Sequence, residues 1–288
     1  MDNAQISTVT PVFRGEQFLG DLIDELSRLR TQWEEDGLPF ELVESIFVDD
    51  GSEDGSSQKL SELEREHAWV RVVFLSRNFG QHPATVAGML HTSGDWVVTL
   101  DEDMQHPPSE IPSLLDTALT QNSDIIYASP KNAVHRSIFR DGASRISKWM
   151  TGLITGNPHV KQFNSFRLIR GNIARGAASV CGHDLYLDLA LGWFTNRISQ
   201  VKLVLEDKRF QAEKASGYTF RKLLGHWRRL FISSQVRLLR LGAGMGLFAI
   251  LGATLYGLKI VCLKILYPSQ YPFKGGPQLL WPSCFSVA

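Results

Sequence analysis

The sequence predicts an α/β protein in which a mostly parallel sheet is flanked by helices. Apolar runs of strand length alternate with segments whose apolar residues recur every three or four positions, and this alternation is typical of βαβ units. Two of the runs end directly in acidic residues, one in Asp49 and Asp50, the other in Asp101 and Asp103. The carboxyl ends of parallel strands open onto the ligand crevice of such sheets. We therefore expect a site there, in which something cationic holds the carboxylates together.

The individual elements follow from the spacing of their apolar residues. Residues 6–13 form a strand that Arg14 and Gly15 stop. Over residues 18–29, Phe, Leu and Ile recur at three- and four-residue intervals, which predicts an amphipathic helix. The later strands are short apolar runs and the later helices repeat the helical spacing. Strands are expected at residues 40–48, 70–75, 96–100, 124–128 and 163–169, and helices at residues 57–67, 85–92, 111–120, 137–153 and 185–194.

Charge is distributed unevenly along the chain, although the formal net charge is zero. All 30 acidic residues lie in residues 1–213, whereas ten of the 30 basic residues lie in residues 214–288. The two parts therefore carry formal charges of −10 and +10 before histidine is counted. A basic, acid-free tail favours contact with a membrane surface or with phosphate groups over a plain basic surface patch.

The C-terminal part divides into three segments. Residues 214–241 interleave Arg, Lys and His with Trp, Leu, Phe and Ile, which is typical of an amphipathic helix in the headgroup region of a membrane; the alternative is a solvated helix face. Residues 242–266 are apolar except for Lys259 and Lys264, and they predict a transmembrane helix rather than a core or re-entrant helix. Residues 267–288 are rich in Pro and Gly and are not assigned.

The cysteines and the N-terminal residues give an expectation for the cellular compartment of the protein. Cys181, Cys262 and Cys284 are widely spaced and form neither a CxxC motif nor a Cys/His cluster. This spacing argues against a disulfide framework or a zinc site and indicates a reducing compartment. The first residues contain no basic stretch followed by an apolar run, so no secretory signal is expected.

Six sequence blocks together resemble a known family. TPVFRGE, VDDGSEDGS, SRNFGQ, DEDMQHPP, SFRLIR and KASGYTFRKL occur in this order. The series resembles the family 2 glycosyltransferases with a GT-A fold, and more narrowly their polyprenyl-phosphate branch, which includes dolichyl-phosphate mannose synthases and bacterial undecaprenyl-phosphate glycosyltransferases. The resemblance extends from residue 6 to about residue 258. It implies a Rossmann-like GT-A catalytic domain over residues 1–213.

The resemblance also implies roles for residues at the predicted strand ends. Asp101 and Asp103 match the family's DxD motif, and Gln105 stands where a further metal ligand is often found. Carboxylate and diphosphate oxygens suit Mg²⁺ or Mn²⁺, which is the expected cofactor. Three groups match segments that contact the nucleotide: Pro11, Phe13 and Glu16; Asp49, Asp50 and Gly51; and Arg77, Asn78 and Gly80.

A second set of residues matches positions that bind phosphate. Arg140 and Arg167 are the candidates to hold the acceptor's phosphate, since a guanidinium fits a phosphate bidentately. Either Lys208 or Arg209 matches a basic residue on the nucleotide diphosphate, and the spacing does not choose between them. Ser216 lies in a loop expected to close over the site.

The chain departs from the family at one position that concerns catalysis. Lys161 and Gln162 stand where many members carry an Asp that has been interpreted as a general base. A phosphate monoester has a second pKa near 6 and is largely dianionic at neutral pH, so proton removal is not required. Asp184 and Asp188 are alternative candidates for a base, although a solvated pair is the simpler interpretation.

These observations predict an inverting, metal-dependent glycosyltransferase. It would move a sugar from a nucleoside diphosphate sugar to a polyprenyl phosphate at the cytoplasmic face of a membrane, with no nucleic-acid partner; a homo-oligomer is compatible with the sequence. One alternative is a glycosyltransferase with another lipid or glycan acceptor. The other is a non-catalytic membrane subunit that binds a nucleotide sugar.

Overall fold

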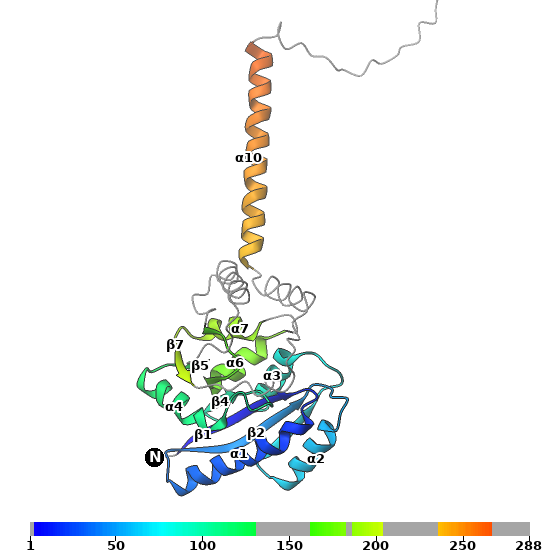
Figure 1. Cartoon of the computed structure of the whole chain (residues 1–288). Coiled ribbons are helices and arrows are strands. Elements are labelled where there is room, and N and C mark those ends of the chain that lie inside the picture. The colour runs from blue at the N-terminus through cyan, green and yellow to red at the C-terminus, as the bar shows by residue number, and fades with distance from the viewer. Residues whose placement is uncertain (1–2, 131–161, 183–185, 204–235, 267–288) are drawn as a thin grey trace, which may run out of the picture. The chain divides into compact units, whose positions relative to one another are not determined.

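The computed structural model describes residues 3–130, 162–182, 186–203 and 236–266 (Figure 1). The chain forms two compact units, Met1–Gln235 and Val236–Ala288. The predicted helix over residues 137–153 lies outside the described residues, as does nearly all of the basic segment 214–241.

The described part of the first unit is organised around a seven-stranded sheet with the order β3-β2-β1-β4-β6-β5-β7. β1 pairs in parallel with β2 and β4, β2 with β3, and β5 with β7, whereas β6 runs antiparallel to β4 and β5. The sheet is therefore mostly parallel, as predicted. The strands are β1 (Ala4–Val12), β2 (Phe40–Asp49), β3 (Val70–Phe74), β4 (Trp96–Thr99), β5 (Ile125–Pro130), β6 (Arg167–Arg170) and β7 (Ile198–Leu203).

Helices cover both faces of the sheet, each with its own apolar core. One core joins the sheet to α1, α2 and α4, and the other joins it to α3, α6 and α7. In α1 the buried residues Leu19, Leu22, Ile23, Leu26 and Leu29 keep the predicted spacing, and burying each contributes about 1.5–3 kcal/mol. The helices are α1 (Glu16–Glu35), α2 (Ser56–Glu66), α3 (Gln81–Leu90), α4 (Ile111–Thr120), α6 (Gly171–Val180) and α7 (Leu187–Phe194), with a 3-10 turn η1 (Pro108–Glu110).

The predicted α/β fold class is confirmed, but two elements were not predicted. Helix α6 was missed because its buried face consists of Gly171, Ala174, Ala177 and Ala178, with Ile173 as its one large apolar residue. Small residues are needed there, since a Cβ at Gly171 would lie 2.2 Å from the carbonyl oxygen of Gly94. Strand β7 lies at the sheet edge and is only partly buried, so its sequence lacks a continuous apolar run.

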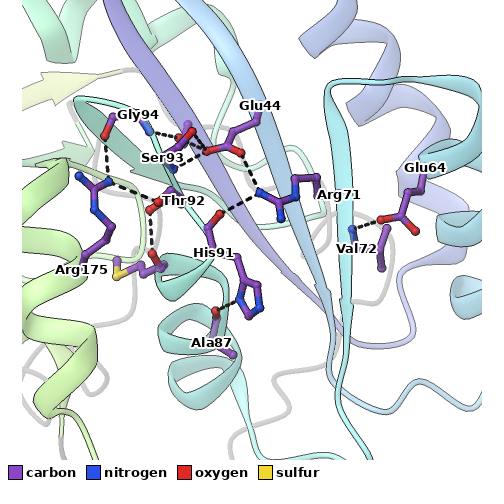
Figure 2. A network of polar contacts seen from close by, with 12 residues as sticks. Glu44, Glu64, Arg71, Val72, Ala87, His91, Thr92, Ser93, Gly94 and Arg175 are labelled. Carbon is purple, nitrogen blue, oxygen red and sulfur yellow. Dashed lines mark hydrogen bonds and ion pairs between the residues drawn. The ribbon is translucent and has the colours of Figure 1, made fainter.

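Glu44 ties several elements together at the amino ends of the strands (Figure 2). Its Oε1 accepts hydrogen bonds from the backbone N–H of Ser93 (2.5 Å) and from the hydroxyl groups of Ser93 and Ser7 (both 2.8 Å). Its Oε2 lies 3.5 Å from Nη1 of Arg71. One carboxylate therefore links β1, β2, β3 and the turn before β4. This edge is opposite to the carboxyl ends of the strands, so the network organises the fold and not the predicted site.

In the second unit, α10 (Val236–Leu266) is a continuous helix of 31 residues. Within it, Gly242–Leu263 spans 22 residues with a mean hydropathy of 1.9, and it is the one helix among the described residues that is long and apolar enough to cross a membrane. Large apolar side chains along it, including Phe248, Leu251 and Leu255, are exposed. Its position agrees with the segment 242–266 that the sequence predicts as transmembrane.

Candidate active site

The candidate site lies at the carboxyl ends of three parallel strands. The register of β1, β2 and β4 aligns Val12 with Asp49 and Val9 with Thr99. The chain continues past each strand in the same direction, and the backbone N–H of Asp50 still bonds to the carbonyl of Val12 (2.9 Å). The acidic residues that follow β2 and β4 therefore meet at one edge of the sheet, as the sequence predicts.

Asp49 and Asp50 stabilise the turns around them. Asp49 accepts hydrogen bonds from the backbone N–H of Ser52 (2.9 Å) and from the hydroxyl of Ser57. Asp50 accepts from the backbone N–H groups of Phe79 (2.7 Å) and Gly80 (2.8 Å). Burial raises the pKa of Asp50, with a further contribution from the charge of Asp49, and these outweigh the two backbone hydrogen bonds. Asp50 thus holds the loop before α3 in place at this edge.

Gly51 fits closely under the same loop. Its φ of +69° is in the left-handed region, and a Cβ would lie 2.6 Å from the carbonyl carbon of Arg77 and 2.8 Å from the nitrogen of Asn78. The Arg77 guanidinium lies 4.7 Å from the centre of the Phe79 ring. Arg77 and Asn78 are exposed and Gly80 is half-buried. The structure therefore brings Asp50, Gly51 and this predicted nucleotide loop into direct contact.

The residues after β1 lie beside the second turn. Pro11 is buried within β1 and Phe13 is half-buried, with the Arg14 guanidinium 5.3 Å from its ring centre. Glu16, the first residue of α1, is exposed and accepts a hydrogen bond from the backbone N–H of Gly55 (3.1 Å). Glu16 thus fixes the turn before α2, and its predicted nucleotide contact stays a prediction.

Asp101 is held by residues from two other elements. Its Oδ1 accepts a hydrogen bond from Nε2 of Gln81 (2.5 Å), the first residue of α3, and its Oδ2 accepts from the hydroxyl of Ser165 (3.1 Å). Its backbone N–H donates to Nδ1 of His106 (3.1 Å). Asp101 is therefore fixed both at its backbone and at its carboxylate.

Asp103 and Gln105 form a short closed turn. Asp103 is 4% exposed, and its carboxylate accepts from the backbone N–H (3.2 Å) and from Nε2 (3.0 Å) of Gln105. Met104 between them has a φ of +60°, a conformation that non-glycine residues rarely adopt. The predicted third ligand therefore lies next to Asp103, with its amide nitrogen directed at that carboxylate.

The donor set at this turn is compatible with Mg²⁺ or Mn²⁺ but is incomplete in itself. No group of three or more His, Cys, Asp or Glu side chains that could hold a metal ion occurs in the described part of the chain. Mg²⁺ commonly uses one or two carboxylates together with water and substrate phosphates. Asp101 and Asp103 fit this type of site, in which the substrate completes the coordination.

His106 is buried next to the turn that contains Asp101 and Asp103. It is 5% exposed, and its ring stacks on Phe166 with centres 5.0 Å apart and an interplanar angle of 14°. Burial lowers the pKa of His106, and the nearby Arg167 acts in the same direction; together they outweigh the opposing charges of Asp101 and Asp103. His106 lies within the DEDMQHPP block, but the sequence alone suggested no role for it.

Arg167 forms an ion pair inside the core. Its guanidinium is 2% exposed and pairs through Nη1 with Asp188 of α7, which is also 2% exposed. The hydroxyl of Tyr127 donates to the same oxygen of Asp188 (2.8 Å). The interpretation of Asp188 as a solvated residue is therefore wrong, because its carboxylate is buried against two donors. The predicted phosphate contact of Arg167 stays a prediction.

Arg140, Lys208, Arg209 and Ser216 lie outside the described residues. Ser165 was not predicted, although it is part of the SFRLIR block. It binds Asp101 because it precedes β6, which pairs with β4 in antiparallel orientation, and this pairing is not visible in the sequence.

Comparison with solved structures shows the GT-A fold. The chain superposes on mannosyl-3-phosphoglycerate synthase from Rubrobacter xylanophilus with a TM-score of 0.55 and 15% identity, over 83% of this chain and 75% of that one. It superposes on the UDP complex of glucosyl-3-phosphoglycerate synthase from Mycobacterium tuberculosis with a TM-score of 0.52 and 18% identity, over 80% of each chain. The class of protein is therefore a GT-A fold with acidic residues at its strand ends.

The family follows from the sequence match. Residues 7–179, more than half of the chain, match the family described as Glycosyl transferase family 2, so the chain belongs to this family and is a glycosyltransferase. Among its relatives is the undecaprenyl-phosphate 4-deoxy-4-formamido-L-arabinose transferase of Klebsiella pneumoniae strain 342, at 30% identity over 94% of this chain and 80% of that one. The enzyme of the same name from Pectobacterium atrosepticum is 28% identical over 95% and 81%. The family resemblance of the six blocks is thereby confirmed.

Proposed function

We propose that this glycosyltransferase moves a sugar from a nucleoside diphosphate sugar to a polyprenyl phosphate, with inversion at the anomeric carbon and with Mg²⁺ or Mn²⁺ as cofactor. The observation that carries the proposal is the turn with Asp101 and Asp103 at the carboxyl edge of the sheet, next to the loop held by Asp50. The printed names of relatives that match 94–95% of this chain specify an undecaprenyl phosphate acceptor, and a neighbouring fold binds UDP.

In this mechanism an oxygen of the acceptor phosphate attacks the anomeric carbon while the bond from that carbon to the diphosphate oxygen breaks. The bonding electrons leave with the nucleoside diphosphate, and a single in-line displacement inverts the configuration. Asp101 and Asp103 would hold the divalent ion, which supplies positive charge for the leaving diphosphate. Asp50 holds the loop that contains Arg77 and Asn78 through the backbone of Phe79 and Gly80, and in this proposal the loop would contact the nucleotide and orient the donor before reaction.

The absence of an Asp at Lys161 and Gln162 is compatible with this reaction. The acceptor is a phosphate monoester that is already largely dianionic at neutral pH. Such an oxygen needs orientation and charge neutralisation more than a base. Basic residues in the segments around Arg140 and Lys208 are the candidates for this neutralisation.

We further propose that α10 anchors the enzyme in a membrane, with the catalytic unit on the cytoplasmic side. The support is the apolar stretch Gly242–Leu263 and its exposed large side chains, together with ten basic and no acidic residues after position 213. A basic segment beside an apolar helix is attracted to the anionic leaflet, where the phosphate of a polyprenyl lipid also lies.

The test measures transfer of labelled sugar from UDP-, GDP- and other nucleotide sugars to undecaprenyl or dolichyl phosphate by the purified full-length protein. Asp103→Asn is expected to lower the rate at least about 100-fold, because it removes one of two charges that hold the ion. Asp116→Asn, at an exposed position of α4, is the matched control. EDTA is expected to stop transfer, and added Mn²⁺ to restore it.

The outcomes separate the proposal from its alternatives. A product that resists mild acid would indicate another acceptor, because a sugar phosphate linkage is labile under those conditions. Binding of a nucleotide sugar without transfer or hydrolysis would indicate a non-catalytic subunit. Full activity of Asp103→Asn, or of EDTA-treated protein, would refute the metal-dependent mechanism.

A further inference from the structure

The turn between Asp101 and His106 is closed by a hydrogen bond whose direction fixes the state of the imidazole. The backbone N–H of Asp101 donates to Nδ1 of His106 over 3.1 Å. A backbone N–H can only donate, so Nδ1 acts as the acceptor and carries no proton. The proton of the neutral ring is therefore on Nε2, and His106 is a hydrogen-bond acceptor toward the turn.

The orientation of the ring also affects the Asp101 carboxylate. Oδ2 of Asp101 lies 3.6 Å from Nδ1 of His106. Oδ2 and the unprotonated Nδ1 are both acceptors and form no hydrogen bond with each other. The Asp101 carboxylate instead accepts hydrogen bonds from Gln81 and Ser165. The ring itself is fixed, because it is buried and stacks on Phe166. His106 thus presents one lone pair to the backbone of Asp101 from a fixed position.

The backbone conformation within the turn explains why hydrogen bonds are needed at both of its ends. Met104 has a φ of +60°, which is unfavourable for a residue with a side chain. The bonds from Gln105 to Asp103 hold one end of the turn, and the bond from Asp101 to His106 holds the other. Without an acceptor at position 106, the backbone of Asp101 would lose its hydrogen bond to the turn, and only the carboxylate contacts with Gln81 and Ser165 would remain.

We infer that His106 is a positioning residue, whose Nδ1 accepts the hydrogen bond from the backbone of Asp101 and holds Asp101 at a fixed distance from Asp103, so that the pair can bind a divalent cation. The inference rests on the proposed function, because it concerns the same ion. His106 would not contact the ion or the substrate. Residues that form hydrogen bonds to metal ligands without binding the metal themselves typically contribute about 10–100-fold to metal affinity.

The experiment compares three substitutions in the full-length protein. In His106→Asn the side-chain amide oxygen lies near the position of Nδ1, so it can still accept the hydrogen bond from the backbone N–H of Asp101. His106→Gln places its polar atoms farther out, near Nε2, and His106→Leu has no acceptor. His67→Leu, at the C-terminal end of α2 beside Trp69, is the control for loss of a histidine elsewhere.

The readout is the dissociation constant of Mn²⁺, measured from the electron paramagnetic resonance signal of free Mn²⁺ without turnover. His106→Leu and His106→Gln are expected to weaken Mn²⁺ binding by about 10–100-fold, and His106→Asn and His67→Leu by less than about threefold. Saturating Mn²⁺ should restore kcat in His106→Leu, because no reacting group is lost. If His106→Leu does not fold, the comparison of Asn with Gln still tests the inference.

Two results would overturn the inference. The first is equal Mn²⁺ affinity in the wild type, Leu and Gln proteins. The second is equal weakening in the Asn and Gln proteins, which would show that the acceptor at Nδ1 is not the relevant feature. Asp103→Asn in the same assay separates this failure from a failure of the proposed function. If Asp103→Asn binds Mn²⁺ as tightly as the wild type, the metal site itself is refuted, and the inference falls with it.

Discussion

Replacing Asp188 by Asn is expected to destabilise the catalytic unit strongly. Asp188 and Arg167 are each 2% exposed and form an ion pair, and Tyr127 donates to the same carboxylate oxygen. Asp188→Asn keeps the shape and an acceptor for Tyr127 but removes the charge that compensates the guanidinium. The pKa of Arg167 is raised, because the nearby Asp188 charge outweighs burial, so Arg167 would remain charged and buried.

The magnitude follows from the burial of the pair. Breaking a buried ion pair at one partner costs about 3–5 kcal/mol, because the other charge is left without compensation. For a unit of 235 residues, each kcal/mol lowers the melting temperature by about 2–4 °C. Asp188→Asn should therefore unfold about 6–20 °C below the wild type. Arg167→Met added to Asp188→Asn should recover most of this loss, since replacing both charges is often neutral.

The assay is thermal unfolding of the full-length protein in detergent, followed by intrinsic fluorescence. The reasoning is refuted if Asp188→Asn melts at the wild-type temperature, or if the double variant melts as low as the single one. The double variant also decides the role predicted for Arg167 from the family resemblance. If the double variant is as stable as the wild type but no longer transfers sugar to polyprenyl phosphate, a phosphate contact of Arg167 is supported. If it retains transfer, the role of Arg167 is structural.

Two further predictions concern the ends of the strands. Gly51→Ala should reduce stability by about 1–3 kcal/mol, because its Cβ would collide with the backbone of Arg77; if the proposed nucleotide contact is correct, it should also weaken binding, in calorimetry, of the nucleoside diphosphate that the transfer assay identifies. Gly37→Ala is the control, with a similar φ of +60° but no atom within 4 Å; equal effects of both variants would show that the collision is irrelevant. Burial raises the pKa of Glu44, but its hydrogen bonds, with Ser93 first, outweigh burial and the net pKa is lowered. Its stabilisation is then complete above the ordinary glutamate pKa of about 4.3 and is lost as pH falls through the lower folded-state value. Glu44→Gln should therefore cost about 1–3 kcal/mol at pH 7 and reduce the acid dependence of urea unfolding; an unchanged acid dependence would contradict the assignment.

The sequence was informative where a structural feature depends on neighbours along the chain. The apolar stripe of α1 and the acidic residues after β2 and β4 were predicted correctly, because helix periodicity and strand ends are local properties. The edge at which Asp49 and Asp101 meet also followed, since parallel strands end on the same side.

Pairings between distant elements were not predictable in this way. Asp188 pairs with Arg167 because α7 packs against the face of the sheet that contains Tyr127, and nothing in the spacing of these residues indicates it. Ser165 reaches Asp101 because β6 enters the sheet beside β4 in antiparallel orientation. Helix α6 was missed because its buried face is made of small residues instead of large apolar ones, and the close contact that makes glycine necessary at position 171 is visible only in the folded structure.

By itself, the sequence determined the α/β class, the strand ends that carry the carboxylates, the apolar C-terminal helix and the family. Each of these depends on which residues are apolar or acidic at a given spacing. Only the tertiary structure decided which groups hold those carboxylates in place, among them His106, Gln81 and Ser165 around Asp101. The physical reason is that a hydrogen bond depends on distance and direction in space, and these are set when helices and strands pack together.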